Sequence, residues 1–571
     1  MPISIENYFT HNYPSFEKLP QFIRSGVISV FKEFFHENEI NDALIEYKNL
    51  DAFSFIESVL EYFNIDITIN KNQLSRIPSY GKVVIIANHP LGALDALALL
   101  NVVKDVRKDI KIVASNFLSE FENISEIIIP IENVRGKMQR NSVKGIYDAL
   151  KKEQAVIIFP SGEVSRVRPN GIKDTKWRKG FLKIAENMQA TVLPIHIDAK
   201  NSKSFYLLSM INKSLATATI PHEMFKYYNK NIAFTIGKSI PYESYNIPSI
   251  SIEDRVKLFR KHFYLVAKKH KGIFKTYNAI ALAENRRELK YELEKAKALG
   301  ETTDGKKVYL YSNEEDNVLI KEIGRLREIS FRQVKEGSGK QRDIDDFDYC
   351  YEHIILWDDK DLEIVGSYRI AKAQEIIETY GVEGLYTSGL FRYKEEFSTY
   401  FMNGIELGRS FVQPKYWNSR ALDYLWQGIG AYLRANPDIR YMFGAVSISR
   451  SYNDEAVELL IYFYMNYFSS KVHSVEHIDS YKISDTKIAK FEKIFLKNDY
   501  AKDILTLKNE LQLIGYAIPT LYKQYSDLCE DDGVQFMDFG VDKEFENCVD
   551  GFIMVDMYKM KAQKRKRYLE R

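Results

Sequence analysis

The stretch between residues 82 and 199 alternates apolar runs with amphipathic segments, and this pattern constrains the fold more than any other feature. The runs VVIIA (83–87), IKIVASN (110–116) and AVIIF (155–159) lack polar alternation, as expected of strands buried on both faces. Between them, LDALALLNVVKDV (94–106) is typical of a helix. The pattern predicts an α/β domain with a largely buried sheet.

The chain of 571 residues is too long for one ordinary core, and its length predicts roughly two to four domains. We place a boundary near residues 272–282, which gives domains of residues 1–275 and 276–571. The second domain holds strand-like pieces such as EHIILWDDKDLEIVGSYRIAKA and IRYMFGAVSIS. Mixed strands with few long crossovers predict an α+β fold for this domain.

Composition excludes several classes of protein. The 80 basic and 78 acidic residues leave a net charge of +2, which does not favour a nucleic-acid partner. Three scattered cysteines without CxxC spacing argue against a disulfide framework, and we expect no metal site. No apolar run reaches the ~18 residues that span a bilayer, and the first residues lack a signal pattern. We therefore expect a cytoplasmic chain, peripheral on the cytoplasmic face of the inner membrane.

Two terminal segments each allow two interpretations. Residues 14–37 place apolar side chains on one helix face, which either packs on its own domain, as we favour, or lies in a membrane interface. The basic tail KMKAQKRKRYLER is either a solvated helix end or a contact for anionic lipid or an acidic carrier protein.

A histidine and an aspartate follow the first buried run. His89 opens a loop directly after it, and Asp95 lies six residues later. A carboxylate at this distance can hold an imidazole that takes a proton from a hydroxyl. The plainer alternative is a turn histidine beside a helix N-cap.

These residues resemble the first motif of the glycerolipid acyltransferases, with five residues between His and Asp instead of four. The segment IIFPSGEVSR (157–166) resembles the third motif with a shifted glutamate, and VLPIHI (192–197) resembles the fourth. Both departures are typical of the hemolysin-like O-acyltransferase branch. The resemblance implies that His89 is the general base and that Asp95 orients it. It extends the site to Asn88, Gly92, Arg140, Ser161, Gly162, Glu163 and Arg166, where backbone N–H groups near Gly92 or Gly162 bind an oxyanion and Arg140 or Arg166 holds an anionic group.

The second half resembles the amino-acid N-acyltransferases of ornithine-lipid synthesis, which have the N-acetyltransferase fold. The matching pieces include LREISFRQVKEGSGKQRDIDDFD (326–348), EIVGSYRI (363–370) and GIELGRSFVQPKYW (404–417). The resemblance implies Glu406 as the base for an amine nucleophile. It implies further substrate contacts at Arg327 and Phe331, at Asp345 and Asp348 for an ammonium group, and at Arg369 or Arg409 for a carboxylate. The alternatives are an internal Glu406–Arg409 ion pair and an aspartate-rich capping loop.

The turn QPKYWNSRALDYL (413–425) lacks the glycines with which acetyltransferases hold the pyrophosphate of coenzyme A. Its composition favours a thioester on acyl carrier protein as donor, with no bound cofactor. Together the halves resemble bifunctional ornithine-lipid synthases. The second half would join a 3-hydroxyacyl chain to an amino acid, with ornithine favoured, and the first would O-acylate the lyso-aminolipid at a membrane surface. The alternatives are a lipid of glycine or another amino acid, and a lysophosphatidate acyltransferase with an accessory second domain.

Overall fold

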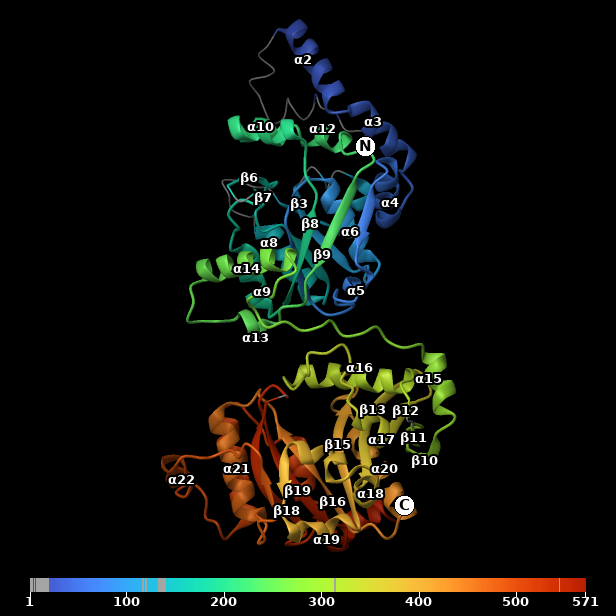
Figure 1. The fold of residues 1–571 in the computed structure, drawn as a ribbon, viewed down its shortest axis with the longest axis vertical. Helices are drawn as coiled ribbons and strands as arrows, with labels where there is room; N and C mark the ends of the chain where they lie inside the picture. The colour runs from blue at the N-terminus through green and yellow to red at the C-terminus, as the bar shows by residue number, and fades with distance from the viewer. Residues whose placement is uncertain are drawn as a thin grey trace. The chain divides into compact units, whose positions relative to one another are not determined.

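The computed structural model describes residues 20–115, 121–131, 140–169, 171–312, 315–543 and 545–570, together with Ser4, Glu6 and Leu118. The chain divides into two compact units, Met1–Ala279 and Ile280–Arg571 (Figure 1). Each unit has its own sheet and its own hydrophobic clusters. Within these described ranges, no helix is long and apolar enough to cross a membrane.

Unit 1 is built on a seven-stranded sheet with the order β1-β9-β8-β2-β5-β3-β4. The strands are β1 (Asp66–Ile69), β2 (Val83–Ala87), β3 (Ile110–Ser115), β4 (Ile128–Ile131), β5 (Ala155–Ile158), β8 (Thr191–Asp198) and β9 (Asn231–Ile236). All neighbouring strands in this order are parallel except β8 and β9. The α/β prediction is therefore confirmed for this unit.

Strand β2 shows why the sheet is covered on both sides. Val83 and Ile85 join the cluster formed with α4 (Ala52–Tyr62) and α6 (Leu94–Lys104). Val84 and Ile86 join the opposite cluster. Successive strand residues point to opposite faces, so an uninterrupted apolar run fills both layers.

The remaining helices of unit 1 are α2 (Gln21–Phe34), α3 (Glu37–Glu46), α5 (Lys71–Leu74), α8 (Arg140–Lys151), α9 (Gly180–Met188), α10 (Lys203–Ile211), α11 (Lys213–Ala218), α12 (Ile220–Phe225), α13 (Tyr242–Tyr245) and α14 (Ile252–Ala267). Helices α8, α9 and α14 supply the second cluster, through residues such as Ile146, Leu182 and Phe259. The segment ISEIIIPI (124–131) is apolar like the strands but begins in the 3-10 turn Glu122–Ile127, and Ile128–Ile131 pairs with β3.

The first amphipathic helix packs at its C-terminal end. The ring of Phe34 stacks on His222 at 4.3 Å, and His36, just after the helix, stacks on Phe225 at 3.9 Å. The packing interpretation is thereby confirmed for this end of α2.

Unit 2 holds an eight-stranded sheet with the order β10-β11-β12-β13-β15-β16-β19-β18. Its strands are β10 (Lys297–Glu301), β11 (Lys307–Tyr311), β12 (Glu352–Asp358), β13 (Glu363–Lys372), β15 (Gly404–Val412), β16 (Tyr441–Ile448), β18 (Val534–Asp542) and β19 (Cys548–Asp556). Every neighbouring pair is antiparallel except β15 and β16. This mixed sheet confirms the α+β prediction.

Strands β15 and β16 pair only from Gly404–Glu406 to Tyr441–Phe443. Farther along β15, one extra residue disturbs the register with β13, and Arg409 has a positive φ of 48°. A β-bulge of this kind bends its strand and redirects a side chain. The sheet therefore loses its pairing between β15 and β16 beside Arg409.

The main helices of unit 2 are α15 (Arg286–Leu293), α16 (Val318–Gln333), α17 (Phe347–Cys350), α18 (Ala373–Tyr380), α20 (Ala421–Ala435), α21 (Asp454–Phe468), α22 (Asp485–Phe491), α23 (Tyr500–Leu513), α24 (Thr520–Ser526) and α25 (Ala562–Tyr568). The basic tail forms α25, where Tyr568 is buried and Arg567 lies 2.7 Å from Asp423 of α20. Lys564 likewise pairs with Asp527 at 2.7 Å. Two cations of the tail are therefore paired with carboxylates of unit 2.

Candidate active sites

The loop after β2 brings His89 and Asp95 together. His89 Nδ1 lies 3.2 Å from Asp95 Oδ2, and the Asp95 side chain is fully buried at the start of α6. The same carboxylate accepts the Leu91 N–H at 2.8 Å and the Ala96 N–H at 2.9 Å. Asp95 thus orders the local turn and also faces the imidazole. It is not the helix N-cap of the alternative interpretation, because Ala93 holds that position.

The electrostatics of His89 follow from these contacts. Burial disfavours the charged ring, but Asp95 and Asp174 outweigh burial, so the pKa of His89 is raised above its usual value. The ring also stacks on Phe159 at 4.1 Å, which limits its rotation. With Nδ1 facing Asp95, Nε2 is the nitrogen that can take a proton from a substrate hydroxyl.

Asp174 is a residue that the sequence analysis missed. Its carboxylate accepts the His89 backbone N–H at 3.2 Å, the Ser165 hydroxyl at 2.7 Å and the Trp177 indole N–H at 3.0 Å. Burial raises the pKa of Asp174, although these bonds oppose the rise. The one local sign of a special role was a single carboxylate among the basic residues of KDTKWRK. The contact with His89 could not be predicted from it, because 85 positions separate the two residues.

Asn88 and Gly92 shape the loop. The Asn88 amide donates to the Ile197 carbonyl at 2.9 Å and accepts the Ile197 N–H at 2.7 Å. These bonds join β2 to β8 and favour a structural role for Asn88 over the predicted contact with substrate. Gly92 has a φ of 105°, and a Cβ there would lie 2.7 Å from Ile220 Cγ2, so a side chain would not fit.

The loop after β5 adds the remaining residues of the first site. The Ser161 hydroxyl donates to the Glu163 carbonyl at 2.7 Å, and the Gly162 N–H donates to the Phe159 carbonyl at 3.0 Å. Gly162 is therefore not the predicted oxyanion donor, since its N–H is already used. Glu163 is half-buried. Arg140 begins α8, but its side chain lies outside the described part of the structure.

Arg166 keeps unused donors in a buried place. Its Nη2 donates to Thr217 Oγ1 at 2.8 Å, and its guanidinium lies 5.1 Å from the ring centroid of Phe205. Nε and Nη1 find no hydrogen-bond partner among the described residues, and burial lowers the pKa of Arg166. The neighbouring Ser165 donates its N–H to the His89 carbonyl at 2.7 Å. An anionic group beside the histidine would satisfy these donors.

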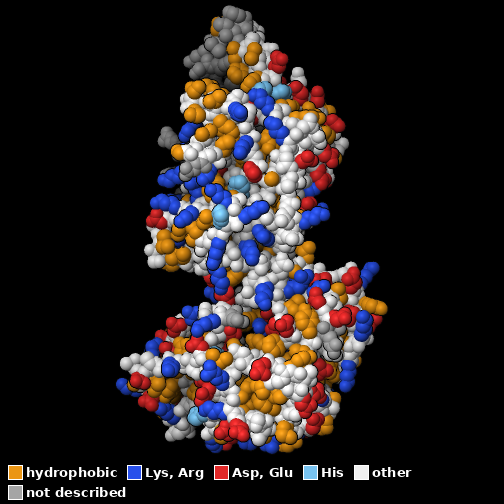
Figure 2. Space-filling view, in the orientation of Figure 1, with side chains coloured by type: hydrophobic (Ala, Val, Ile, Leu, Met, Phe, Trp, Pro, Cys, Tyr) orange, Lys and Arg blue, Asp and Glu red, His pale blue; other side chains and the backbone are white. Residues whose placement is uncertain are grey.

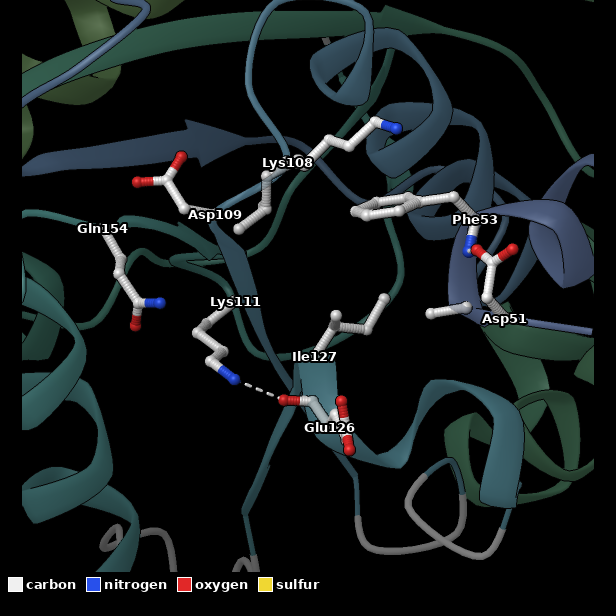
Figure 3. A pocket seen from close by; sticks show the side chains of 10 residues that line it. Asp51, Phe53, Lys108, Asp109, Lys111, Glu126, Ile127 and Gln154 are labelled. Carbon is white, nitrogen blue, oxygen red and sulfur yellow. Dashed lines mark hydrogen bonds between the residues drawn. The ribbon is translucent and has the colours of Figure 1, made fainter.

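A hollow of about 320 Å³ lies elsewhere in unit 1 (Figure 3). Its lining includes Asp109, Ile110 and Gln154, which precede or begin β3 and β5, whereas His89 follows the carboxyl end of β2. In Figure 3, the Lys111 amine donates to the Glu126 carbonyl across this hollow. None of the predicted site residues lines it.

In unit 2, Glu406 is buried on β15 and accepts four hydrogen bonds. The donors are the Tyr351 hydroxyl, the Tyr386 N–H at 3.0 Å, the Thr387 N–H at 2.8 Å and the Thr387 hydroxyl. A carboxylate held in this way is saturated and 1% exposed. The geometry favours positioning of residues 386–387 over the predicted role of Glu406 as a base.

The predicted ammonium site is an internal charge network. Arg327 is 1% exposed, and its guanidinium donates two hydrogen bonds to Asp348, of 2.9 and 2.7 Å. Its Nε donates a third to Asp343 at 2.7 Å. Arg369 pairs with Asp345, and its guanidinium lies among three aromatic rings. Arg327 and Asp348 neutralise each other in this geometry, which favours a structural role over the predicted contacts with substrate.

Arg409 and Asp345 form the more accessible edge of this network. Arg409 Nη2 lies 3.5 Å from Asp345 Oδ2, and its guanidinium lies 5.0 Å from the Tyr386 ring and 4.8 Å from the Phe545 ring. Phe331 is buried and packs edge-on against Phe545 at 5.2 Å, so it supports this wall from behind. The Glu406–Arg409 ion pair considered above is not the arrangement found, since Arg409 faces aspartates.

Two carboxyl groups that interact electrostatically with Arg409 were missed by the sequence analysis. Burial raises the pKa of Glu336, after α16, to about 8, with Asp550 adding to the shift and Arg409 opposing it. Burial also raises the pKa of Asp550, on β19, to about 6. The Glu336 side chain is partly exposed, so solvent reaches it. No local pattern marks the pair, because 214 positions separate the two residues.

Comparisons with known proteins agree with this architecture. Residues 13–271 match the family model "Acyltransferase", and residues 326–427 match "Acetyltransferase (GNAT) domain". The chain is 30% identical over 295 residues to the glycine N(alpha)-acyltransferase of Phocaeicola vulgatus, covering 49% of this chain and 90% of that protein. It is 30% identical over 233 residues to the lyso-glycine lipid O-acyltransferase of the same organism, covering 40% and 82%. An L-ornithine N(alpha)-acyltransferase of Brucella abortus is 29% identical over 166 residues, covering 24% and 58%.

A His–Asp pair on a parallel sheet and a GNAT-type mixed sheet define an acyltransferase with two domains for acyl transfer. The chain belongs to the family of aminolipid acyltransferases that includes these N- and O-acyltransferases. The predicted resemblance is thereby confirmed, together with enzymatic function.

Proposed function

We propose that the chain builds a diacylated amino-acid lipid in two steps, with glycine as the amino acid. Unit 2 joins a 3-hydroxyacyl chain to the amine, and unit 1 acylates the 3-hydroxyl of the product. The observation that carries the proposal is the presence, in one chain, of long similarity to both a glycine N-acyltransferase and a lyso-glycine lipid O-acyltransferase. Because both units belong to one chain, the poorly soluble mono-acyl intermediate would stay at a high effective concentration near the O-acylation site of unit 1.

Glycine replaces ornithine as the favoured substrate for two reasons. Similarity extends over 90% of the glycine enzyme but over 58% of the ornithine enzyme. Ornithine carries a second ammonium, which needs a carboxylate partner. Asp343, Asp345 and Asp348 are already paired with arginines.

In the first site, His89 Nε2 would take the proton of the lyso-lipid hydroxyl as its oxygen attacks the thioester carbonyl. Asp95 would hold the ring and stabilise the imidazolium. When the tetrahedral intermediate collapses, the thiolate leaves and takes this proton from His89. Arg166 would bind the carboxylate of the lyso-lipid or a phosphate of the donor with its unused N–H groups.

In the second site, Glu336 would be the general base in place of Glu406. An amine must lose a proton on its way to an amide, and a carboxylate with a pKa of about 8 is well matched to accept one near neutral pH. Arg409 would bind the carboxylate of glycine from the half-open side of the charge network. Glu406 would position the 386–387 backbone that forms part of this wall.

We propose acyl carrier protein as donor for both steps, with no bound cofactor. The turn after β15 has no glycine between Gln413 and Leu425 to wrap a pyrophosphate. Its cations are also engaged, because Lys415 pairs with Glu363 at 2.5 Å and Arg420 lies 3.4 Å from Asp423. The prosthetic phosphopantetheine of the carrier needs no such nucleotide cradle.

The test is reconstitution of the purified chain with 3-hydroxyacyl carrier protein, acyl carrier protein and either glycine or ornithine, followed by lipid mass spectrometry. The expected product is a diacylated glycine lipid, and His89→Ala should stop at N-acylglycine. If a lipid forms with ornithine but not with glycine, the chain makes an ornithine lipid and the glycine proposal is wrong. Acylation of lysophosphatidate without any amino-acid product would replace the proposal with a phospholipid activity.

A further inference from the structure

Helices α10 and α11 expose apolar side chains on their outer surface. Leu207 is 64% exposed, Met210 71%, Ile211 85% and Leu215 57%. The inner side of the same helices is packed, with Phe205, Tyr206 and Ala216 buried against Val164 in a small separate cluster. Four large apolar side chains next to one helix–helix turn are more than the scattered exposure of an ordinary surface.

The charge of this region is one-sided. Residues 199–222 contain Lys200, Lys203 and Lys213 but no aspartate or glutamate. The adjoining hairpin of β6 (Arg166–Arg168) and β7 (Gly171–Lys173) contributes Arg168 and Lys173, and residues 164–173 are also free of acidic residues. Ile172 of this hairpin packs on the same small cluster as α10. Figure 2 shows hydrophobic and basic side chains gathered in the region of α10.

This surface adjoins the loop that carries His89. The Asn201 amide, just before α10, donates to the Pro90 carbonyl at 3.0 Å, and Thr217 of α11 accepts from Arg166. Ile220 at the start of α12 lies against Gly92. A ligand resting on α10 and α11 would therefore lie next to the first active site.

We propose that the surface formed by α10, α11 and the β6–β7 hairpin docks on an anionic lipid bilayer, with Met210 and Ile211 inserted among the headgroups. Exposed apolar side chains with cations on the same helices and the adjoining hairpin match the interfacial region of such a membrane. The inference rests on the proposed function for its purpose, since a lyso-lipid acceptor would enter the His89 loop directly from the bilayer. It is favoured over the two terminal segments as the membrane contact, because α2 packs on α12 at its C-terminal end and Lys564 and Arg567 of α25 are paired with carboxylates.

Vesicle flotation of the full chain tests the proposal. The vesicles contain either phosphatidylcholine alone or phosphatidylcholine with one third phosphatidylglycerol. The double variant Met210→Ser/Ile211→Ser should lower the partition coefficient on anionic vesicles at least tenfold. The variant Lys203→Ala/Lys213→Ala should lower it about fivefold for each lysine on anionic vesicles, and leave binding to neutral vesicles unchanged. All four positions are exposed, so the fold should tolerate the changes.

The matched control is Leu505→Ser/Leu513→Ser on α23, where Leu505 is 60% and Leu513 80% exposed. It should bind vesicles within twofold of the unaltered chain. Equal binding by the Met210/Ile211 variant, equal loss by the control, or no vesicle binding by the unaltered chain would each overturn the proposal. If the Met210/Ile211 variant loses binding to acyl carrier protein but still binds vesicles, the proposal is overturned and the surface is a docking site for the carrier protein.

Activity is measured separately with a short-chain, water-soluble lyso-lipid and with the same headgroup embedded in vesicles. The Met210/Ile211 variant should keep its turnover of the soluble acceptor and lose turnover of the embedded one. If no lyso-lipid is acylated by any form, yet vesicle binding changes as expected, the proposed function fails and the docking surface stands. If acylation of embedded acceptor persists with unchanged binding, the docking surface fails and the function stands.

Discussion

Replacement of Glu406 by Gln separates a positioning residue from a base. The Glu406 carboxylate receives two backbone N–H groups and two hydroxyls while 1% exposed. In the variant, one acceptor oxygen becomes an amide NH₂. Each oxygen of Glu406 accepts from one hydroxyl and one backbone N–H. The hydroxyl can rotate and accept a hydrogen bond from the new NH₂ group. The backbone N–H cannot accept, so two donors then face each other.

The magnitude follows from these contacts. Loss of a charge-assisted bond costs about 1.5–3 kcal/mol, and one buried unsatisfied donor costs about 1–3 kcal/mol more. The free energy of unfolding of unit 2 should therefore fall by roughly 2.5–6 kcal/mol. For a unit that spans Ile280–Arg571, the melting temperature should drop by about 4–10 °C.

The assay is differential scanning calorimetry of the full chain, with Glu396→Gln as control. Glu396 is exposed in the same unit, so the control should change the unfolding free energy by less than about 0.5 kcal/mol. If Glu406→Gln melts within 2 °C of the unaltered chain and yet abolishes N-acylation, the positioning argument is refuted and the carboxylate is the base.

Four further outcomes are expected. Asp95→Asn should lower the rate of O-acylation about 10²- to 10⁴-fold and leave N-acylation unchanged, as seen by accumulation of the mono-acyl product in mass spectrometry. The rate of O-acylation should rise with pH through the raised pKa of His89, because only the neutral ring accepts a proton, and removal of the Asp95 charge should move this rise to lower pH in a rate profile. The rate of N-acylation should rise as the pH passes about 8, where Glu336 loses its proton. The variant Glu336→Gln should be slower, and its rate should rise with pH only through the titration of the substrate amine. The control variant Asp345→Asn should keep the rise that is due to Glu336. Asp174→Asn should lower O-acylation and raise the protease sensitivity of the loops around His89 and Ser165, and a variant indistinguishable in both assays would contradict its positioning role.

Local pattern was sufficient for the first site. His89 and Asp95 lie on one loop and the first turn of the following helix, so a spacing of six residues nearly determines their contact. The apolar run that precedes them is a strand in any buried sheet. Asp174 could not be found in this way, because its carboxylate reaches His89 only after two chain segments meet.

The structure brings together the charged residues predicted for the second site. Arg327, Asp345, Asp348, Arg369 and Arg409 do converge, but as partners of one another. A sequence shows that charges are present, and it does not show which of them are buried together. Pairing is decided by burial, since an unpaired charge in the interior is too costly to persist.

The sequence by itself determined the two fold classes and the His–Asp pair, because strand and helix periodicity and a short loop are local properties of the chain. Only the tertiary structure decided that Glu406 is saturated, that Glu336 interacts electrostatically with Asp550 and Arg409, and that α10 and α11 expose apolar side chains. Each of these depends on which distant groups exclude water from one another. That exclusion is a property of the packed chain, and no local stretch of sequence carries it.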